Sequence, residues 1–305
     1  MGEFLFRRTL QSLFALIGLF IAVFCLVRLT GNPADLLLPV DTPAAMREEL
    51  SQRFGFDQPI YVQFVDYIRG LARFDFGMSL RQQRPAMEAA LEALPWTLKL
   101  AAVAMSFAIV FALVAGSIAA SRTGGAFDRA ISLFSLAGAS APDFWIAILG
   151  IMVLSVQLQL LPTSGTGTVW HWILPVLVLG LRPFGLLVQV VRGTMIGVLS
   201  SPYVKTARAK GVRQRSVIFV HALRNSMLPV ITVAGDLAAS LLNGAVVVEA
   251  IFGWPGIGKL MLNAILERDF AVVQSAILVT AVAILILNIL IDVLYALVDP
   301  RIRHR

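Results

Sequence analysis

The sequence predicts an all-α, polytopic membrane protein with six transmembrane helices. The chain is 58% hydrophobic and only 14% charged, whereas soluble domains carry about 25% charged residues. It contains six apolar runs, each long enough to cross roughly 30 Å of hydrocarbon. Its cations gather in the short segments on one side of these runs, as expected for a protein inserted by the positive-inside rule.

The apolar runs lie at residues 10–27, 96–120, 131–157, 172–191, 229–252 and 272–298. Arg7 and Arg8 precede the first run. This run is too long for the apolar core of a secretory signal, and no small-residue cleavage pattern follows it, so we interpret it as an uncleaved first helix. The predicted regions are an N-terminal transmembrane helix at 1–29, an external segment at 30–95, a five-helix core at 96–298 and a tail at 299–305.

The external segment is predicted to be helical and to form a small cap. Apolar residues recur at helical spacing at Ile60, Phe64, Ile68 and Leu71. We expect helices at residues 46–54 and 61–74, separated by a turn at 55–59.

The charges predict an orientation. Residues 192–228 contain seven Lys and Arg and no Asp or Glu, whereas residues 30–95 contain six Arg against nine acids. Both termini and residues 192–228 should therefore be cytoplasmic. Because the cations are spread over loops, we expect no nucleic-acid partner. Cys25 is the only cysteine, so no disulfide or cysteine-based metal site is expected.

The most informative segment is Tyr-Val-Lys-Thr-Ala-Arg-Ala-Lys-Gly at residues 203–211, followed by a second basic stretch at 221–229. Small residues before Gly211 predict a short helix that ends at this glycine, and a second helix should start near Ser216. The residues alone leave two interpretations open. The segment is either a basic loop held by anionic lipid headgroups or a protruding docking element.

This segment resembles the cytoplasmic coupling loop of permeases in the dipeptide, oligopeptide and nickel ATP-binding-cassette importer family. The resemblance covers nearly the whole chain through further motifs in the same order: Gly31-Asn32-Pro33-Ala34, residues 56–59, residues 74–79, residues 252–258 and residues 299–303. Departures are Asn32, where the family usually has aspartate, and Gly197 and Pro202, where acidic residues are common. The missing acids make this loop more cationic than its relatives.

The resemblance implies a type I importer fold in a bacterial inner membrane and a division of labour. Two permease subunits would form the pore, two cytoplasmic P-loop ATPases would bind ATP and Mg, and an external solute-binding protein would deliver the solute. This chain would be no enzyme by itself and would bind no cofactor or metal. The implied ATPase-coupling residues are Lys205, Thr206, Ala207, Arg208, Ala209, Lys210 and Gly211. The implied contacts with the binding protein are Gly253, Trp254, Pro255, Gly256, Ile257 and Gly258, although a plain turn between two spans remains an alternative for this motif.

Residues 253–260 also approach the pattern of a phosphate-binding loop. Leu260 stands where such a loop needs Ser or Thr for magnesium, and no strand is predicted before it. We therefore expect no nucleotide site there.

Polar residues inside the apolar runs are the remaining candidates, because such groups are costly in lipid. Asp236, Ser240 and Asn243 share one helical face of the fifth run. Asn288, Asp292 and Tyr295 repeat this spacing in the sixth run. Each stripe either lines a translocation path or holds helices together.

Arg182, inside the fourth run, is the least expected residue. Three explanations stay open. It pairs with Asp236 or with an acid of a partner permease, it faces the translocation path and attracts an anionic solute group, or it snorkels toward the lipid headgroups.

The predicted function is that of a permease subunit that forms half of a translocation path. The solute would be a peptide or a related small molecule, such as a nickel chelate or a glutathione-like peptide, and coupling to an ATPase would use residues 203–229. The alternative is an ion-coupled secondary transporter or channel. An intramembrane enzyme is disfavoured because its usual metal-binding and nucleophile motifs are missing from the sequence.

Overall fold

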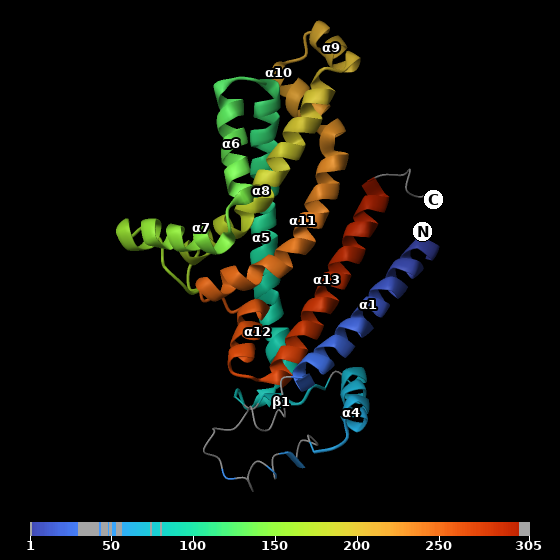
Figure 1. Ribbon diagram of the computed structural model, residues 1–305. Helices are drawn as coiled ribbons and strands as arrows, with labels where there is room; N and C mark the ends of the chain where they lie inside the picture. The colour runs from blue at the N-terminus through green and yellow to red at the C-terminus, as the bar shows by residue number, and fades with distance from the viewer. Residues whose placement is uncertain are drawn as a thin grey trace. The chain divides into compact units, whose positions relative to one another are not determined.

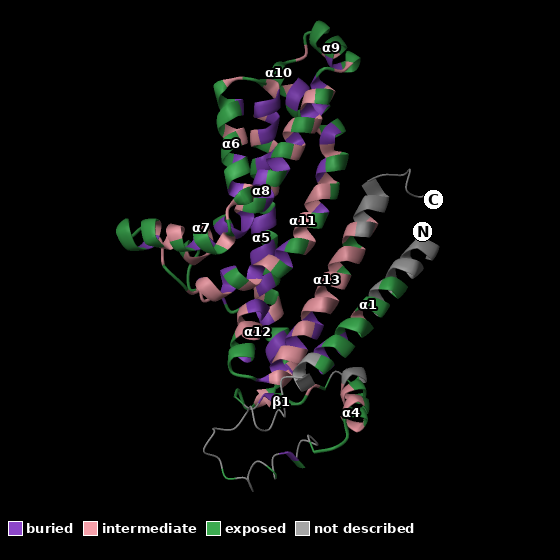
Figure 2. Ribbon diagram, viewed as in Figure 1, coloured by how far each residue is buried: buried purple, intermediate pink, exposed green. Residues whose placement is uncertain are grey.

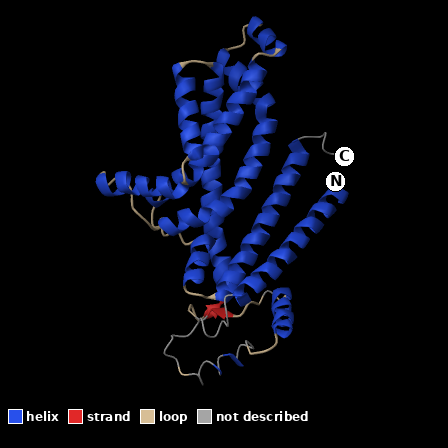
Figure 3. Cartoon of the chain, viewed as in Figure 1, coloured by secondary structure: helices blue, strands red, loops and turns tan. Residues whose placement is uncertain are grey.

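The computed structural model describes residues 2–29, 43, 48, 51–52, 57–73, 75–79 and 81–298. These residues are mainly helical (Figure 3). The larger elements are α1 (Gly2–Leu29), α4 (Ile60–Ala72), α5 (Ala86–Ser121), α6 (Ala126–Ser140), α7 (Asp143–Gly150), η1 (Ile151–Gln157), α8 (Trp170–Leu199), α9 (Pro202–Ala209), α10 (Gln214–Ser216), η2 (Val217–Ala222), α11 (Leu223–Ile251), α12 (Ile257–Leu266) and α13 (Phe270–Val298). The strands β1 (Met78–Ser79) and β2 (Arg84–Pro85) form an antiparallel pair in which Met78 is opposite Pro85.

The chain divides into two compact units. The first comprises Met1–Trp96 with Pro255–Ile289, and the second comprises Thr97–Trp254 with Leu290–Arg305. The division falls within α5, beside Pro95.

In the first unit, α4 packs on α1 through aromatic side chains. The ring of Phe24 lies 5.1 Å from that of Phe64 and 5.4 Å from that of Tyr67, centroid to centroid. Burial raises the pKa of Tyr67 to about 12, so its phenol stays neutral. The structure thus has a helix where the spacing predicts one at 61–74, while most of the helix expected at 46–54 lies outside the described residues.

Small residues and a buried polar contact hold α5, α12, α13 and the strand pair of the first unit together. Ala90 and Ala93 of α5 pack with Ile257 of α12 and with Ala276 of α13. The hydroxyl of Ser79 donates a hydrogen bond of 2.5 Å to the Asp269 carboxylate. This bond ties the strand pair to the start of α13.

In the second unit, α8 is the central helix. It packs along both α6 and α11, and Figure 2 shows buried residues along much of its length. Its buried side chains include Leu187, Val188 and Val191, each fully enclosed.

By length and composition, four helical segments qualify as single membrane spans: Ala86–Ser121, Trp170–Leu199, Gln214–Ile251 and Phe270–Ile291. The bent pair formed by α6 with α7 and η1 would make a fifth. Within α1, the apolar stretch Phe14–Cys25 is shorter than these spans. Among the described residues the structure therefore supports four or five spans, and the sixth stays a prediction.

The run at 131–157 was expected as one span, but the chain bends by 108° between α6 and α7. Ala141 and Pro142 are both extended at this break, with ψ of 138° and 135°. Proline disfavours helical conformation in the residue before it, which explains the break. Figure 1 shows α7 leaving the direction of α6 at a steep angle.

Two other predicted spans begin too late in the sequence, because we placed their first residues at or directly after prolines. α5 starts at Ala86 and continues through Pro95, and α11 starts at Leu223 and continues through Pro229. Lipid offers backbone groups no hydrogen-bonding alternative, so helices there tolerate an internal proline better than helices in water do. The short helix α12 was not predicted.

Candidate coupling element, solute cavity and family

The coupling candidate is a short helix that ends at a glycine, as the sequence predicts. α9 begins with Pro202 and is followed by Gly211 at φ +78°. The amide of Val212 donates to the carbonyl of Ala207, and that of Gly211 donates to the carbonyl of Arg208. This pattern is a Schellman motif, which requires a left-handed residue at the position of Gly211.

One side of α9 is anchored. Val204 is fully buried, and α9 packs on η2, where Val217 and Ala222 are also fully buried. The side-chain amide of Asn225 donates a hydrogen bond of 3.0 Å to the Tyr203 hydroxyl. These contacts hold α9 against the helical segment that leads into α11.

The other side of α9 is exposed and basic. Lys205, Arg208 and Lys210 are exposed, and no described carboxylate lies within ion-pair distance of them. Of the other predicted coupling residues, Thr206, Ala209 and Gly211 are exposed, and Ala207 is half-buried. The structure therefore brings the predicted set together on one protruding element (Figure 1).

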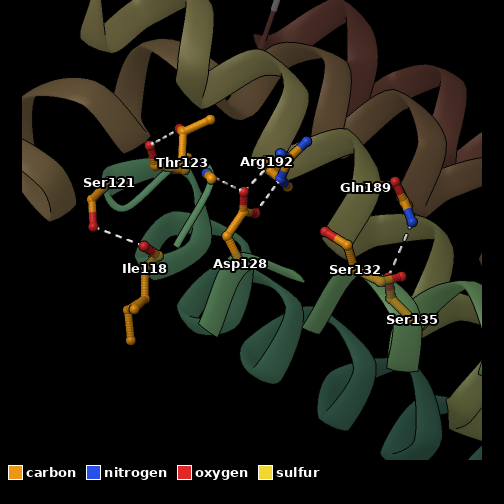
Figure 4. A network of polar contacts seen from close by, with 10 residues as sticks. Ile118, Ser121, Thr123, Asp128, Ser132, Ser135, Gln189 and Arg192 are labelled. Carbon is orange, nitrogen blue, oxygen red and sulfur yellow. Dashed lines mark hydrogen bonds and ion pairs between the residues drawn. The ribbon is translucent and has the colours of Figure 1, made fainter. Parts of the chain in front are cut away.

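An ion pair that we did not predict lies near the C-terminal end of α8, the end from which the chain continues into α9. The Asp128 carboxylate accepts hydrogen bonds of 2.5 and 2.9 Å from the Arg192 guanidinium and one of 2.8 Å from the Gly124 amide (Figure 4). Asp128 is buried, and the Arg192 side chain is 29% exposed. The pair joins the start of α6 to α8, and the Gly124 amide adds the turn before α6. The sequence contains one indication of this pair, because Asp128 is the only acid in residues 121–130.

Four residues were predicted to line the translocation path, namely Arg182, Asp236, Ser240 and Asn243. Three of them meet at one cavity. Arg182 of α8 and Ser240 and Asn243 of α11 line an open cavity of about 370 Å³, and all three are exposed. Asp236 is also exposed but does not line the cavity. No ion pair joins Arg182 to Asp236, so that explanation of Arg182 is wrong within this chain. The acid beside the cavity is instead Asp143, the first residue of α7.

Asp143 was missed because only the break before α7 brings it to this cavity.

In the sixth run, Asn288 is half-buried, and the side chains of Asp292 and Tyr295 lie outside the described residues.

The motif expected to contact a binding protein is mostly buried. Trp254 is fully buried and meets Trp172 edge to face, with ring centroids 4.6 Å apart. Gly253 has φ +63°, and the Trp254 amide donates to the carbonyl of Glu249. The residues form a turn, as expected.

Gly256, Ile257 and Gly258 are also buried, whereas Pro255 is exposed. Contact with a binding protein stays a prediction. Pro255 is the exposed residue of the motif that such a protein could reach.

Comparison with known proteins identifies the family of this chain. Residues 112–304 match the family described as binding-protein-dependent transport system inner membrane component. The chain is 40% identical to the di/tripeptide transport system permease protein DppB of Pseudomonas aeruginosa (strain UCBPP-PA14), with both chains fully covered. It is 36% identical to the oligopeptide transport system permease protein AppB of Bacillus subtilis (strain 168) and 37% identical to the glutathione transport system permease protein GsiC of Escherichia coli (strain K12), again with full coverage. The chain therefore belongs to the family of binding-protein-dependent transport system inner membrane components.

Proposed function

We propose that this chain is the permease subunit of an ATP-binding-cassette importer and forms half of the path for a peptide or a related small solute. The observation that carries the proposal is α9, an exposed basic helix capped at Gly211 and anchored on η2 in a chain of this family. The names of the relatives, which refer to di/tripeptides, oligopeptides and glutathione, support a peptide or peptide-like solute.

The proposed assembly contains a second permease, two cytoplasmic ATPases that bind ATP and Mg, and an external solute-binding protein. α1 would be the first of six spans. Residues 30–95 would lie outside, and both termini would be cytoplasmic, because the segment at 192–228 is strongly basic.

Coupling would work as a rigid-body movement. A short helix that sits in an ATPase cleft is pushed when the ATPase closes, and its anchored face passes that displacement to the attached spans. Buried Val204 would make α9 move with η2 and α11 rather than fold away from them.

The solute path would run past Arg182, Ser240, Asn243 and Asp236. Residues 253–258 would lie at the outer mouth, near the docked binding protein.

The experiment is ATP turnover by the reconstituted importer with Gly211→Pro or Arg208→Glu. Proline fixes φ at about −65°, far from the +78° of Gly211, and it removes the amide that donates to Arg208. Arg208→Glu reverses an exposed charge on α9. We expect both variants to insert normally and to lose most solute-stimulated ATP turnover, by tenfold or more if the altered contact costs about 1.4 kcal/mol.

The matched control is Arg122→Glu, a charge reversal at an exposed arginine in the turn between α5 and α6. It should retain turnover. Normal turnover in both α9 variants would remove the coupling assignment, and solute uptake by the purified chain without any ATPase would favour the ion-coupled carrier.

A further inference from the structure

A cavity of about 370 Å³ lies between the start of α7, the middle of α8 and α11. It opens to the surface of the second unit, since Arg182, Ser240 and Asn243 are exposed. Its volume falls in the range of small-molecule sites, roughly 300–1,000 Å³. Four polar side chains line it, namely Asp143, Arg182, Ser240 and Asn243, and leucines of α8 and α11 line much of the rest. A mainly apolar wall with a few polar groups is typical of a ligand site.

The two charged residues have opposite signs and come from different helices. Arg182 of α8 and Asp143 of α7 line the same cavity. Among the described residues, neither side chain makes an ion pair or a side-chain hydrogen bond. A direct pair would occupy part of the hydrogen-bonding capacity of both groups, whereas here each keeps its full capacity for a ligand.

The space beside Asp143 is left open by a glycine. A Cβ atom added at Gly244 of α11 would lie 4.0 Å from Oδ2 of Asp143, so the carboxylate faces a part of α11 that carries no side chain. One turn earlier, the Ser240 hydroxyl donates to the Leu237 carbonyl. The oxygen of Ser240 can still accept a hydrogen bond.

We propose that this cavity binds the two charged ends of a zwitterionic solute. The Arg182 guanidinium has the planar fork that matches a carboxylate, and Asp143 accepts hydrogen bonds from an ammonium group. Asn243 and Ser240 bind a peptide amide between the two ends, and the leucines contact small apolar side chains. The inference rests on the proposed function and adds that the permease itself selects its solute by charge.

The competing explanation is that Arg182 and Asp143 only stabilise the helix bundle. A structural pair is recognised by its effect on stability. Removing one partner leaves an unpaired charge that destabilises the protein, whereas removing both partners avoids this unpaired charge. The test therefore uses Arg182→Gln, Asp143→Asn and the double variant in the complete importer, purified with its partner subunits through a tag on this chain. Arg122→Gln, at an exposed arginine outside the cavity, is the control.

Three quantities are measured for each variant: the melting temperature of the complex, ATP turnover stimulated by the binding protein, and uptake of radiolabelled dialanine into proteoliposomes. We expect melting and ATP turnover to stay at the wild-type level in all variants. Uptake should fall about tenfold or more in each single variant, the factor expected for the loss of one hydrogen bond to a charged group. The double variant should be no better than either single one.

Other results overturn the inference. A lower melting temperature in either single variant assigns that residue to the stability of the bundle, and recovery of melting and uptake in the double variant identifies a structural pair. ATP turnover that falls in parallel with uptake assigns the residues to a conformational step. Unchanged uptake in the single variants removes the site while the proposed function stands. If the wild-type importer shows no ATP-dependent uptake, the proposed function fails and the inference falls with it.

Discussion

The close packing of α8 on α6 predicts that one methyl group at Gly185 destabilises the second unit. A Cβ atom at this position would overlap the carbonyl oxygen of Ser135 and would lie 3.1 Å from both the backbone nitrogen and the Cβ of Ala139. Two of these three obstacles are backbone atoms of α6, which cannot rotate away. Gly185→Ala therefore forces the two helices apart.

Gly193, two turns further along the same helix, is the matched control. It is exposed, and a Cβ there would meet nothing within 4 Å. Replacing glycine by alanine inside a helix gains about 1 kcal/mol, and overpacking costs about 1–3 kcal/mol. With the overlap at the upper end of that range, Gly185→Ala should destabilise by about 2 kcal/mol and Gly193→Ala should stabilise by about 1 kcal/mol.

The free energy of unfolding is measured on the tagged chain in mixed micelles, by titration with a denaturing detergent followed by circular dichroism. The helix-propensity gain is the same in both variants, so it cancels in their difference. A difference of about 3 kcal/mol isolates the overlap at Gly185. Equal unfolding free energies for the two variants would refute the packing of α6 on α8 described above.

Two further predictions concern the ion pair and the topology. Asp128→Asn should lower the unfolding free energy by about 1–2 kcal/mol, less than the 3–5 kcal/mol typical of a fully buried pair, because the Arg192 side chain is 29% exposed. The same titration measures it, with Arg122→Gln as the control, and an unchanged value would show that solvent compensates Arg192. A reporter enzyme fused after Arg305 should be active in the cytoplasm and one inserted near Gln82 should be active outside, because residues 192–228 carry seven cations and no acid. The reverse pattern would overturn the proposed orientation.

The local parts of this structure could be predicted from the sequence. Hydropathy located the apolar helices, and the glycine rule placed the end of α9 at Gly211, because both depend on residues that are close along the chain. Proline gave an ambiguous signal. The chain breaks at Pro142 but remains helical through Pro175 and Pro183, and no local pattern separates these cases.

The contacts between distant residues could not be predicted in this way. Asp128 and Arg192 are 64 positions apart, and they meet because α6 packs along α8. Asp143 lies beside Arg182 only because α7 leaves the direction of α6 by 108°. The spacing of Asp236, Ser240 and Asn243 indicated one helical face, but Asp236 does not line the cavity.

In the proposed function, α8 is the element that links the cavity to the ATPase. It carries Arg182 at its middle and Arg192 near its end, and only Ser200 and Ser201 separate it from α9. From Arg182 to Leu199 the helix is roughly 26 Å long at 1.5 Å per residue. Because α6 packs along α8 and the Asp128 ion pair fixes their ends together, a tilt imposed on α9 would move α8 and α6 as one body. α11 would move with them, because α9 is anchored on η2, which leads into α11, and α11 packs along α8. Closure of the ATPase would in this way reorient the charged site as a whole without any rearrangement inside α8 itself.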